Sequence, residues 1–142
     1  MRRPESPTET LLQDLLDRVD GAFAAAIGTL EGLLVEGVGR RRVDLEAAVA
    51  EHAALLRQAR AAYAGSLGTP RVEELLVGGH PVVGYARMVR AGSTSREGWA
   101  FRQGSSDLFL LLLLEAEGNL GQARWQTAKA RERLWEVAGW LT

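Results

Sequence analysis

The sequence predicts an α/β fold in the order helix, hairpin, helix, three or more strands and a final helix. Three observations support it. A leucine-rich amphipathic helix opens the chain, a hairpin marked by glycines follows it, and an apolar run at 106–115 leads into a helix start at Asn119. This run is far shorter than the roughly 20 residues that cross a bilayer, so it predicts a strand buried on both faces.

The first helix begins at a predicted capping box. Ser6 is expected to be the N-cap, Pro7 suits the first helical position, and Glu9 stands where it can complete the box. Leucines then recur at helical spacing until the stop at Asp20-Gly21.

Two apolar segments, 22–29 and 33–38, are expected to pair as a hairpin. The turn between them is Leu30-Glu31-Gly32, in which glycine supplies the positive φ of a tight turn. The alternative is one long alanine-rich helix from residue 22. Four glycines between residues 28 and 39 argue against it, because each costs roughly 1 kcal/mol inside a helix.

A second helix is predicted from its N-cap Asp44 to about Gly65. One apolar stripe recurs at spacings of three and four residues, and it consists of Leu45, Val49, His52, Leu56, Ala59 and Tyr63. A second stripe beside it consists of Ala48, Leu55 and Ala62. Further alanines leave little polar surface, so we expect this helix to pack against more than its own sheet.

Strands are predicted at 71–77, at 98–103 and in the leucine run, with a further candidate at 81–89. The last helix starts at the N-cap Asn119, with Gln122 in the position that closes a capping box. Its apolar stripe turns Trp125 away from the core, while Trp135 and Trp140 flank the stripe. Large exposed aromatics mark an interaction surface or cover a sheet edge, and the sequence favours neither.

Composition limits the class of protein. The chain has 142 residues, which suggests one domain, and a net charge of -1, which gives no general attraction to nucleic acid. Cysteine is absent, which excludes disulfides and zinc–thiolate sites. The N-terminal arginines are not followed by an apolar segment, so no secretory signal is expected and the protein is predicted to be cytoplasmic, without membrane insertion.

A search for catalytic chemistry finds little. The two histidines, His52 and His80, have no ligand cluster around them, and His52 is expected to be a packed or interfacial imidazole. The segment 91–95 lacks the Gly-Lys-Ser/Thr ending of a phosphate loop, and the arginines at 40–42 are expected to form a solvated loop. We therefore expect no catalytic residue, no cofactor and no metal.

Three segments together resemble the Roadblock/dynein light chain family, and within it the MglB-like bacterial gliding regulators. Residues 11–26 are similar to the family's opening, a leucine-rich helix that runs into a glycine-started strand. Residues 29–35 resemble its hairpin, with Glu-Gly where the family usually has Asp-Gly. Residues 108–124 resemble its closing leucine strand and Asn-Leu-Gly helix start.

The resemblance implies a Roadblock-like three-layer sandwich with the order α-β-β-α-β-β-β-α. A five-stranded antiparallel sheet would carry the helix of residues 44–65 on one face and the first and last helices on the other. Residues 1–142 would form a single such domain, with a short flexible N-terminus at 1–6. The region of about 78–98 departs from the family pattern, so an insertion is expected there.

The resemblance also implies a non-enzymatic protein that acts through partners. It implies a homodimer built on the second helix and an edge strand, and the expected interface residues are Leu45, Val49, His52, Leu55, Leu56 and Ala59. It further implies that a small Ras-like GTPase binds the face of the paired helices, where the expected contacts are Arg57, Arg60, Glu46 and Glu51. The alternative function is a structural adaptor that has no GTPase partner.

Overall fold

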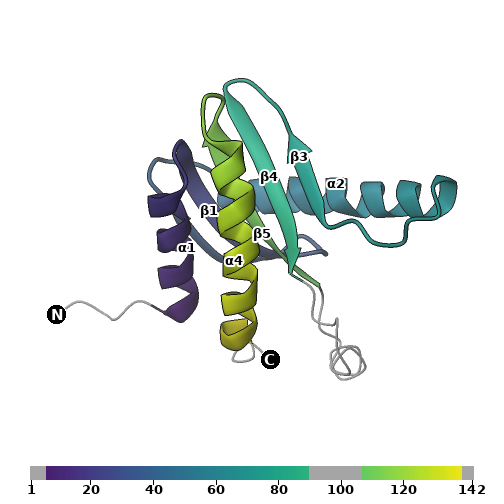
Figure 1. The fold of residues 1–142 in the computed structure, drawn as a ribbon, viewed down its shortest axis with the longest axis horizontal. Coiled ribbons are helices and arrows are strands. Elements are labelled where there is room, and N and C mark those ends of the chain that lie inside the picture. The colour runs from purple at the N-terminus through teal and green to yellow at the C-terminus, as the bar shows by residue number, and fades with distance from the viewer. Residues whose placement is uncertain (1–5, 90–106, 139–142) are drawn as a thin grey trace.

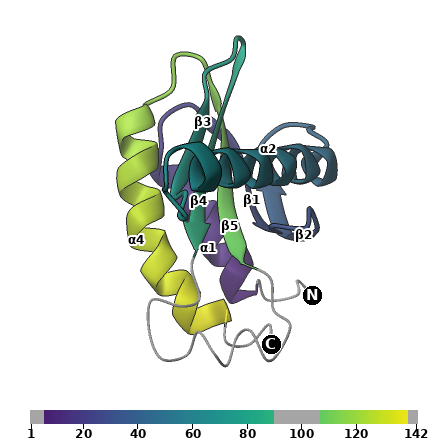
Figure 2. The ribbon, with the colours of Figure 1, turned by 90° about the vertical axis from the view of Figure 1, so that its right-hand side faces the viewer.

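A computed structural model describes residues 6–89 and 107–138. Its elements are α1 (Pro7–Arg18), β1 (Ala22–Thr29), β2 (Leu34–Gly39), α2 (Leu45–Ser66), β3 (Glu74–Val77), β4 (Val82–Val89), β5 (Leu108–Glu115) and α4 (Leu120–Ala138). The strands form one antiparallel sheet in the order β2-β1-β5-β4-β3. Helices α1 and α4 cover one face and α2 crosses the other (Figures 1 and 2), which confirms the predicted three-layer fold class.

Strand β5 occupies the centre of the sheet because its side chains are apolar on both faces. It pairs with β1 on one side and β4 on the other. Leu110, Leu112 and Leu114 join the core beneath α1 and α4. Their neighbours Phe109, Leu111 and Leu113 join the core beneath α2. The leucine run is thus the doubly buried strand that its composition predicts.

The predicted helix caps are present. At each one a side-chain oxygen accepts a hydrogen bond from a backbone N–H three residues on: Ser6 from Glu9 (3.1 Å), Asp44 from Ala47 (3.0 Å) and Asn119 from Gln122 (2.9 Å). The predicted turn is present too, with a φ of 104° at Gly32. These local signals set the starts of α1, α2 and α4 and the position of the first hairpin.

Gln122 differs from its predicted role. Its side-chain oxygen accepts from the backbone N–H of Asp20 (2.8 Å) and does not close a capping box. The backbone N–H of Asn119, which a capping box would occupy, donates instead to the carbonyl of Asp20 (2.9 Å). The start of α4 is therefore tied to the turn after α1, a contact between residues far apart in the sequence.

The region expected to hold an insertion contains a strand of the sheet. Residues 82–89 are β4, which pairs along its length with β5, so this part of the expected insertion is wrong. The strand predicted at 71–77 is shorter than expected and begins at Glu74. The strand predicted at 98–103, and residues 90–98 of the expected insertion, lie outside the described residues.

Candidate functional site

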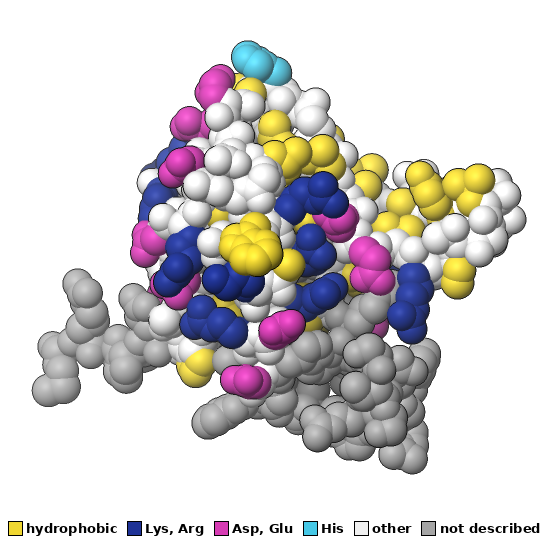
Figure 3. Space-filling view, viewed as in Figure 1, with side chains coloured by type: hydrophobic (Ala, Val, Ile, Leu, Met, Phe, Trp, Pro, Cys, Tyr) yellow, Lys and Arg dark blue, Asp and Glu magenta, His cyan; other side chains and the backbone are white. Residues whose placement is uncertain are grey.

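Helix α2 is anchored at its first half and projects past the sheet at its second. Val49, Ala53 and Leu56 are buried against the sheet. From residue 61 to residue 66 every position is exposed. Figure 1 shows this end of α2 extending beyond the sheet, and Figure 3 shows hydrophobic side chains along it. An unsupported, alanine-rich helix end of this kind is a candidate interface.

Apolar residues are also exposed at the neighbouring edge of the sheet. Strand β3 pairs only with β4 in the described part of the chain, so its outer edge is open. Leu76, Val77 and Val82 are exposed by 49%, 40% and 37%. In Figure 1, β3 lies on the side of the molecule toward which α2 projects. We call the exposed apolar residues Leu55, Tyr63, Leu67, Leu76, Val77 and Val82 the α2–β3 surface.

The structure separates the predicted interface residues into two groups. Val49 and Leu56 are fully buried in the core of their own chain, so their assignment to a dimer interface is wrong. Leu55 is 40% exposed, while Leu45, His52 and Ala59 are half-buried. The two leucine-containing stripes looked equivalent in the sequence, but the stripe of Val49 and Leu56 is the one that faces the sheet.

His52 is packed within the chain. Its Nδ1 lies 2.8 Å from the carbonyl oxygen of Ala48, one turn earlier in α2. The ring lies against Gly84 of β4, where a Cβ would come within 2.4 Å of Nε2. Glycine at position 84 thus makes room for the imidazole between helix and strand.

The predicted partner-binding residues all lie at the surface of α2 or near it. Glu46, Glu51 and Arg57 are exposed and Arg60 is half-buried. Arg57 donates to the carbonyl of Leu30, and Arg60 forms an ion pair with Asp107 (3.3 Å). Both arginines therefore contact their own chain, while no interaction is found for the two glutamates within the described residues.

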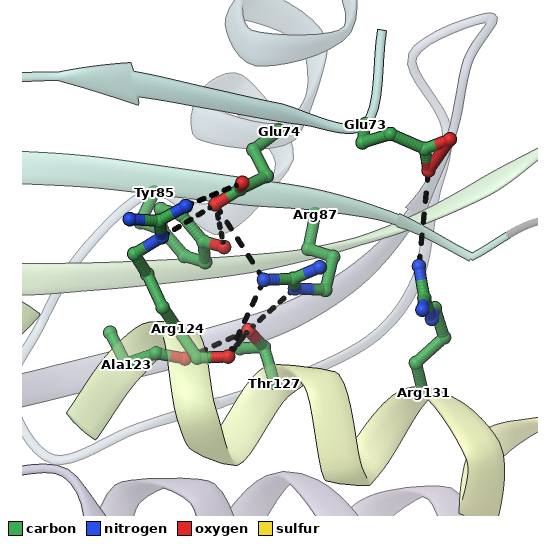
Figure 4. A network of polar contacts seen from close by, with 8 residues as sticks. All are labelled: Glu73, Glu74, Tyr85, Arg87, Ala123, Arg124, Thr127 and Arg131. Atoms are coloured by element: carbon green, nitrogen blue, oxygen red, sulfur yellow. Dashed lines mark hydrogen bonds and ion pairs between the residues drawn. The ribbon is translucent and has the colours of Figure 1, made fainter. Parts of the chain in front are cut away.

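A network of polar contacts holds β3 against α4 (Figure 4). Glu74 of β3 accepts two hydrogen bonds of 2.9 Å from the guanidinium of Arg124 and one of 2.6 Å from the hydroxyl of Tyr85. Arg87 lies 3.6 Å from the same carboxylate and donates to Thr127 (3.1 Å). The network thus fixes the short edge strand from the side opposite α2.

Burial and these contacts shift the pKa values of three groups in the network, and the hydrogen bond to Glu74 raises that of Arg124. The hydrogen bonds from Arg124 lower the pKa of Glu74, and burial raises the pKa of Tyr85. Glu74 is therefore ionised at neutral pH, in a two-point pairing with a planar guanidinium. Sequence reasoning missed this network because its members come from β3, β4 and α4 and show no common motif.

Two of the three arginines at 40–42 contact other parts of the chain. Arg40 pairs with Asp17 of α1. The Arg41 guanidinium stacks 3.6 Å from the ring centroid of Phe23 and lies 3.6 Å from Glu115. Both side chains remain about half exposed, so the loop is solvated as expected, and each arginine also contacts its own chain.

Two features are absent from the described residues. Within 6–89 and 107–138, no group of His, Asp and Glu side chains is placed to hold a metal ion. No helix in these ranges is long and apolar enough to span a membrane. The candidate phosphate loop at 91–95 lies outside them. What the described surface offers is apolar and charged patches suited to protein contacts.

Comparison with known proteins identifies the fold. No family model matches the sequence, and no curated protein matches it. A Roadblock/LC7 domain from Streptomyces avermitilis superimposes with a TM-score of 0.74 at 15% identity, covering 90% of this chain and 94% of that one. The chain thus has the Roadblock/LC7 fold.

Two of the similar structures are proteins of the Mgl group. An MglB solved in a tetrameric arrangement has a TM-score of 0.73 at 18% identity, over 92% of this chain and 86% of that one. MglC from Myxococcus xanthus has a TM-score of 0.54 at 29% identity, over 87% and 92%. The predicted resemblance to Roadblock and MglB-like proteins is confirmed.

Proposed function

We propose that the protein is a Roadblock-type regulator, a cytoplasmic homodimer that binds a small Ras-like GTPase and has no catalytic residues of its own. The observation that carries the proposal is the α2–β3 surface. A helix end that leaves the sheet and an open apolar strand edge lie on one side of the molecule. A second copy related by two-fold symmetry would cover both features at once.

The exposure of apolar side chains in the single chain supports the dimer. The exposed residues of the α2–β3 surface include Leu55 and Tyr63 on the helix and Leu76 and Val77 on the strand. Exposed apolar side chains gathered at one edge of a small domain favour an interface there. Pairing of β3 with the β3 of a second copy would also satisfy its open N–H and C=O groups. The Glu74 network holds β3 in place for such pairing.

The GTPase part of the proposal is based on the resemblance to MglB-like regulators and on the charges of α2. Arg57, Glu46 and Glu51 are exposed on this helix, and arginine is favoured at interfaces. Their side chains could pair with charged groups of a switch region on the partner. We assign the docking role to this face of the dimer, centred on Arg57 and Arg60.

The test uses the double variant Arg57→Glu/Arg60→Glu. The immobilised wild-type protein should retain a Ras-like GTPase from native extract supplied with a non-hydrolysable GTP analogue. The double variant should bind the purified GTPase at least tenfold more weakly, equivalent to about 1.4 kcal/mol. Sedimentation should still report a dimer. Equal binding by the wild type and the variant would exclude this face as the docking site.

A structural adaptor without a GTPase partner is the second candidate. The observation that favours it is that Arg57 and Arg60 are already engaged with Leu30 and Asp107 of their own chain. An adaptor would retain other proteins but no GTPase, whatever nucleotide analogue is added. Nucleotide-dependent retention therefore separates the two functions.

A further inference from the structure

The face of the molecule opposite α2 carries an exposed tryptophan among cations. Figure 3 shows Lys and Arg side chains gathered over α4 around an exposed hydrophobic group. Trp125 of α4 is 64% exposed, whereas Phe23, Tyr85 and Phe109 are buried. It lies on neither α2 nor β3, so the proposed dimer does not cover it. Large exposed aromatics with a polar handle are enriched at sites of protein recognition.

A hollow between α1 and α4 is lined in part by Lys129, the neighbour of this tryptophan in α4. Its volume is about 110 Å³, and its lining includes the apolar side chains Leu11, Leu15 and Ala130. An apolar cavity of about 150 Å³ accepts benzene, so a hollow of this size suits one small apolar side chain. The floor of the hollow is therefore apolar and concave, unlike a flat charged surface.

The rim of the hollow is positively charged. Arg18, Lys129 and Arg133 line it with Asp14 as its one acidic residue, which gives a net charge of +2 at neutral pH. Arg133 pairs with Asp14 (3.4 Å), while Arg18 and Lys129 have no carboxylate partner in the described part of the chain. The Lys129 ammonium lies 5.6 Å from the centroid of the Trp125 ring, within cation–π range.

The unpaired cations differ from the other arginines nearby. Arg124 and Arg87 pair with Glu74, and Arg131 lies 3.9 Å from Glu73. Among the cations of α1 and α4, Arg18 and Lys129 are the two without a carboxylate partner in the described residues, and they come from the two helices that flank the hollow. Arg18 and Lys129 lie on either side of an apolar floor. They therefore match a peptide in which an apolar side chain is flanked by a carboxylate on each side.

We propose that this surface, formed by Arg18, Trp125, Gln126 and Lys129 around the hollow, binds an acidic linear segment of a partner protein. An aliphatic side chain of the segment occupies the hollow, and carboxylates before and after it pair with Arg18 and Lys129. The Trp125 ring packs along the bound backbone. A membrane fits less well, because anionic lipid is recognised by clusters of about 4–8 cations near the surface.

The test uses two pools of short synthetic peptides. In one pool Leu or Ile is flanked by Asp and Glu, and in the matched pool the acids are replaced by Lys and Arg. Binding is followed at low salt by NMR of the ¹⁵N-labelled protein. The indole signal of Trp125 is identified by its absence in Trp125→Phe. The acidic pool should shift this signal and the amides that flank the hollow, and the basic pool should not.

The variant Arg18→Glu/Lys129→Glu should bind the acidic peptides at least tenfold more weakly than the wild type. It should fold normally, because neither residue forms an ion pair with another described residue, and its amide spectrum away from the hollow should be unchanged. Arg57→Glu/Arg60→Glu is the matched control and should bind the acidic peptides like the wild type. The GTPase assay should give the reverse pattern, so the two proposals fail independently.

Several outcomes would overturn the inference. One is the absence of shifts at millimolar acidic peptide, and another is equal peptide binding by the wild type and Arg18→Glu/Lys129→Glu. Binding to phosphatidylserine vesicles without any response to peptides would assign the surface to a membrane. A change in sedimentation of Trp125→Phe without peptide would assign it to contacts between copies of the chain.

Discussion

Leu55 and Leu56 are neighbours in α2, but one is exposed and the other is buried. Alanine substitutions at the two positions therefore distinguish effects on dimerisation from effects on folding stability. Leu56 is 0% exposed and Leu55 is 40% exposed. Leu56→Ala should lower the free energy of unfolding by about 2–5 kcal/mol, as for other buried leucines. Leu55→Ala should lower it by about 1 kcal/mol or less, because much of the side chain is already in water.

The effect of Leu55→Ala on the dimer follows from the fraction of the Leu55 side chain that is exposed in the single chain. Burying a whole leucine side chain contributes about 1.5–3 kcal/mol, so burying the exposed 40% of Leu55 contributes roughly 0.6–1.2 kcal/mol. A two-fold interface contains the residue twice. The dissociation constant of the dimer should therefore rise by roughly sevenfold to sixtyfold.

Sedimentation equilibrium over a range of concentrations measures the dissociation constant. Urea unfolding at two protein concentrations separates loss of folding stability from loss of association. The reasoning is refuted if the wild type is a monomer at micromolar concentration. It is equally refuted if Leu55→Ala leaves the dissociation constant unchanged in a protein that does dimerise.

Three further predictions concern stability and ligands. Glu74→Gln should reduce the free energy of unfolding by about 1–2 kcal/mol at neutral pH, since hydrogen bonds to charged groups are the stronger ones. The pKa of Glu74 is lower in the folded than in the unfolded protein. The stabilisation by its ionised carboxylate is therefore complete above the unfolded pKa of about 4.3 and is lost as the pH falls through the folded pKa. Urea unfolding at neutral and at acid pH measures this loss. Gly21→Ala should lower the free energy of unfolding by more than about 1 kcal/mol, because φ is 87° at this residue and a Cβ would lie 2.5 Å from Gly118. Gly65→Ala should stabilise α2, because the space around this glycine is open. A loss of stability in both variants would contradict this account. Calorimetric titration with GTP, ATP or zinc should show no binding, and a micromolar dissociation constant for any of them would contradict the non-enzymatic proposal.

Local signals were sufficient to predict most of the fold. The starts of three helices follow from one polar side chain each, at Ser6, Asp44 and Asn119, because the cap interaction spans only three residues. The central strand follows from seven consecutive apolar residues at 108–114, which leave no polar face. Such information is contained within a single element and needs no knowledge of its neighbours.

The candidate surfaces needed the tertiary structure. Two stripes of α2 carry leucine among alanines, and only packing against the sheet shows that Leu56 faces inward and Leu55 outward. Strand β4 agrees with the candidate strand at 81–89, but the same residues were also assigned to an insertion, because the segment next to them has no clear pattern. The partners of Glu74 lie 11 and 50 residues away in the sequence, at Tyr85 and Arg124, so no local pattern announces them.

The central position of β5 has a consequence for how the chain is made. The β1–β2 hairpin and the β3–β4 hairpin do not touch along an edge, and β5 joins them. During synthesis both hairpins emerge before this strand, each with an open edge that invites pairing with another chain. The sheet closes only after residue 115 has been added, when contacts distant in sequence form together. Nascent chains that stall before β5 should therefore be prone to aggregation, and the sheet should close only once β5 has emerged from the ribosome.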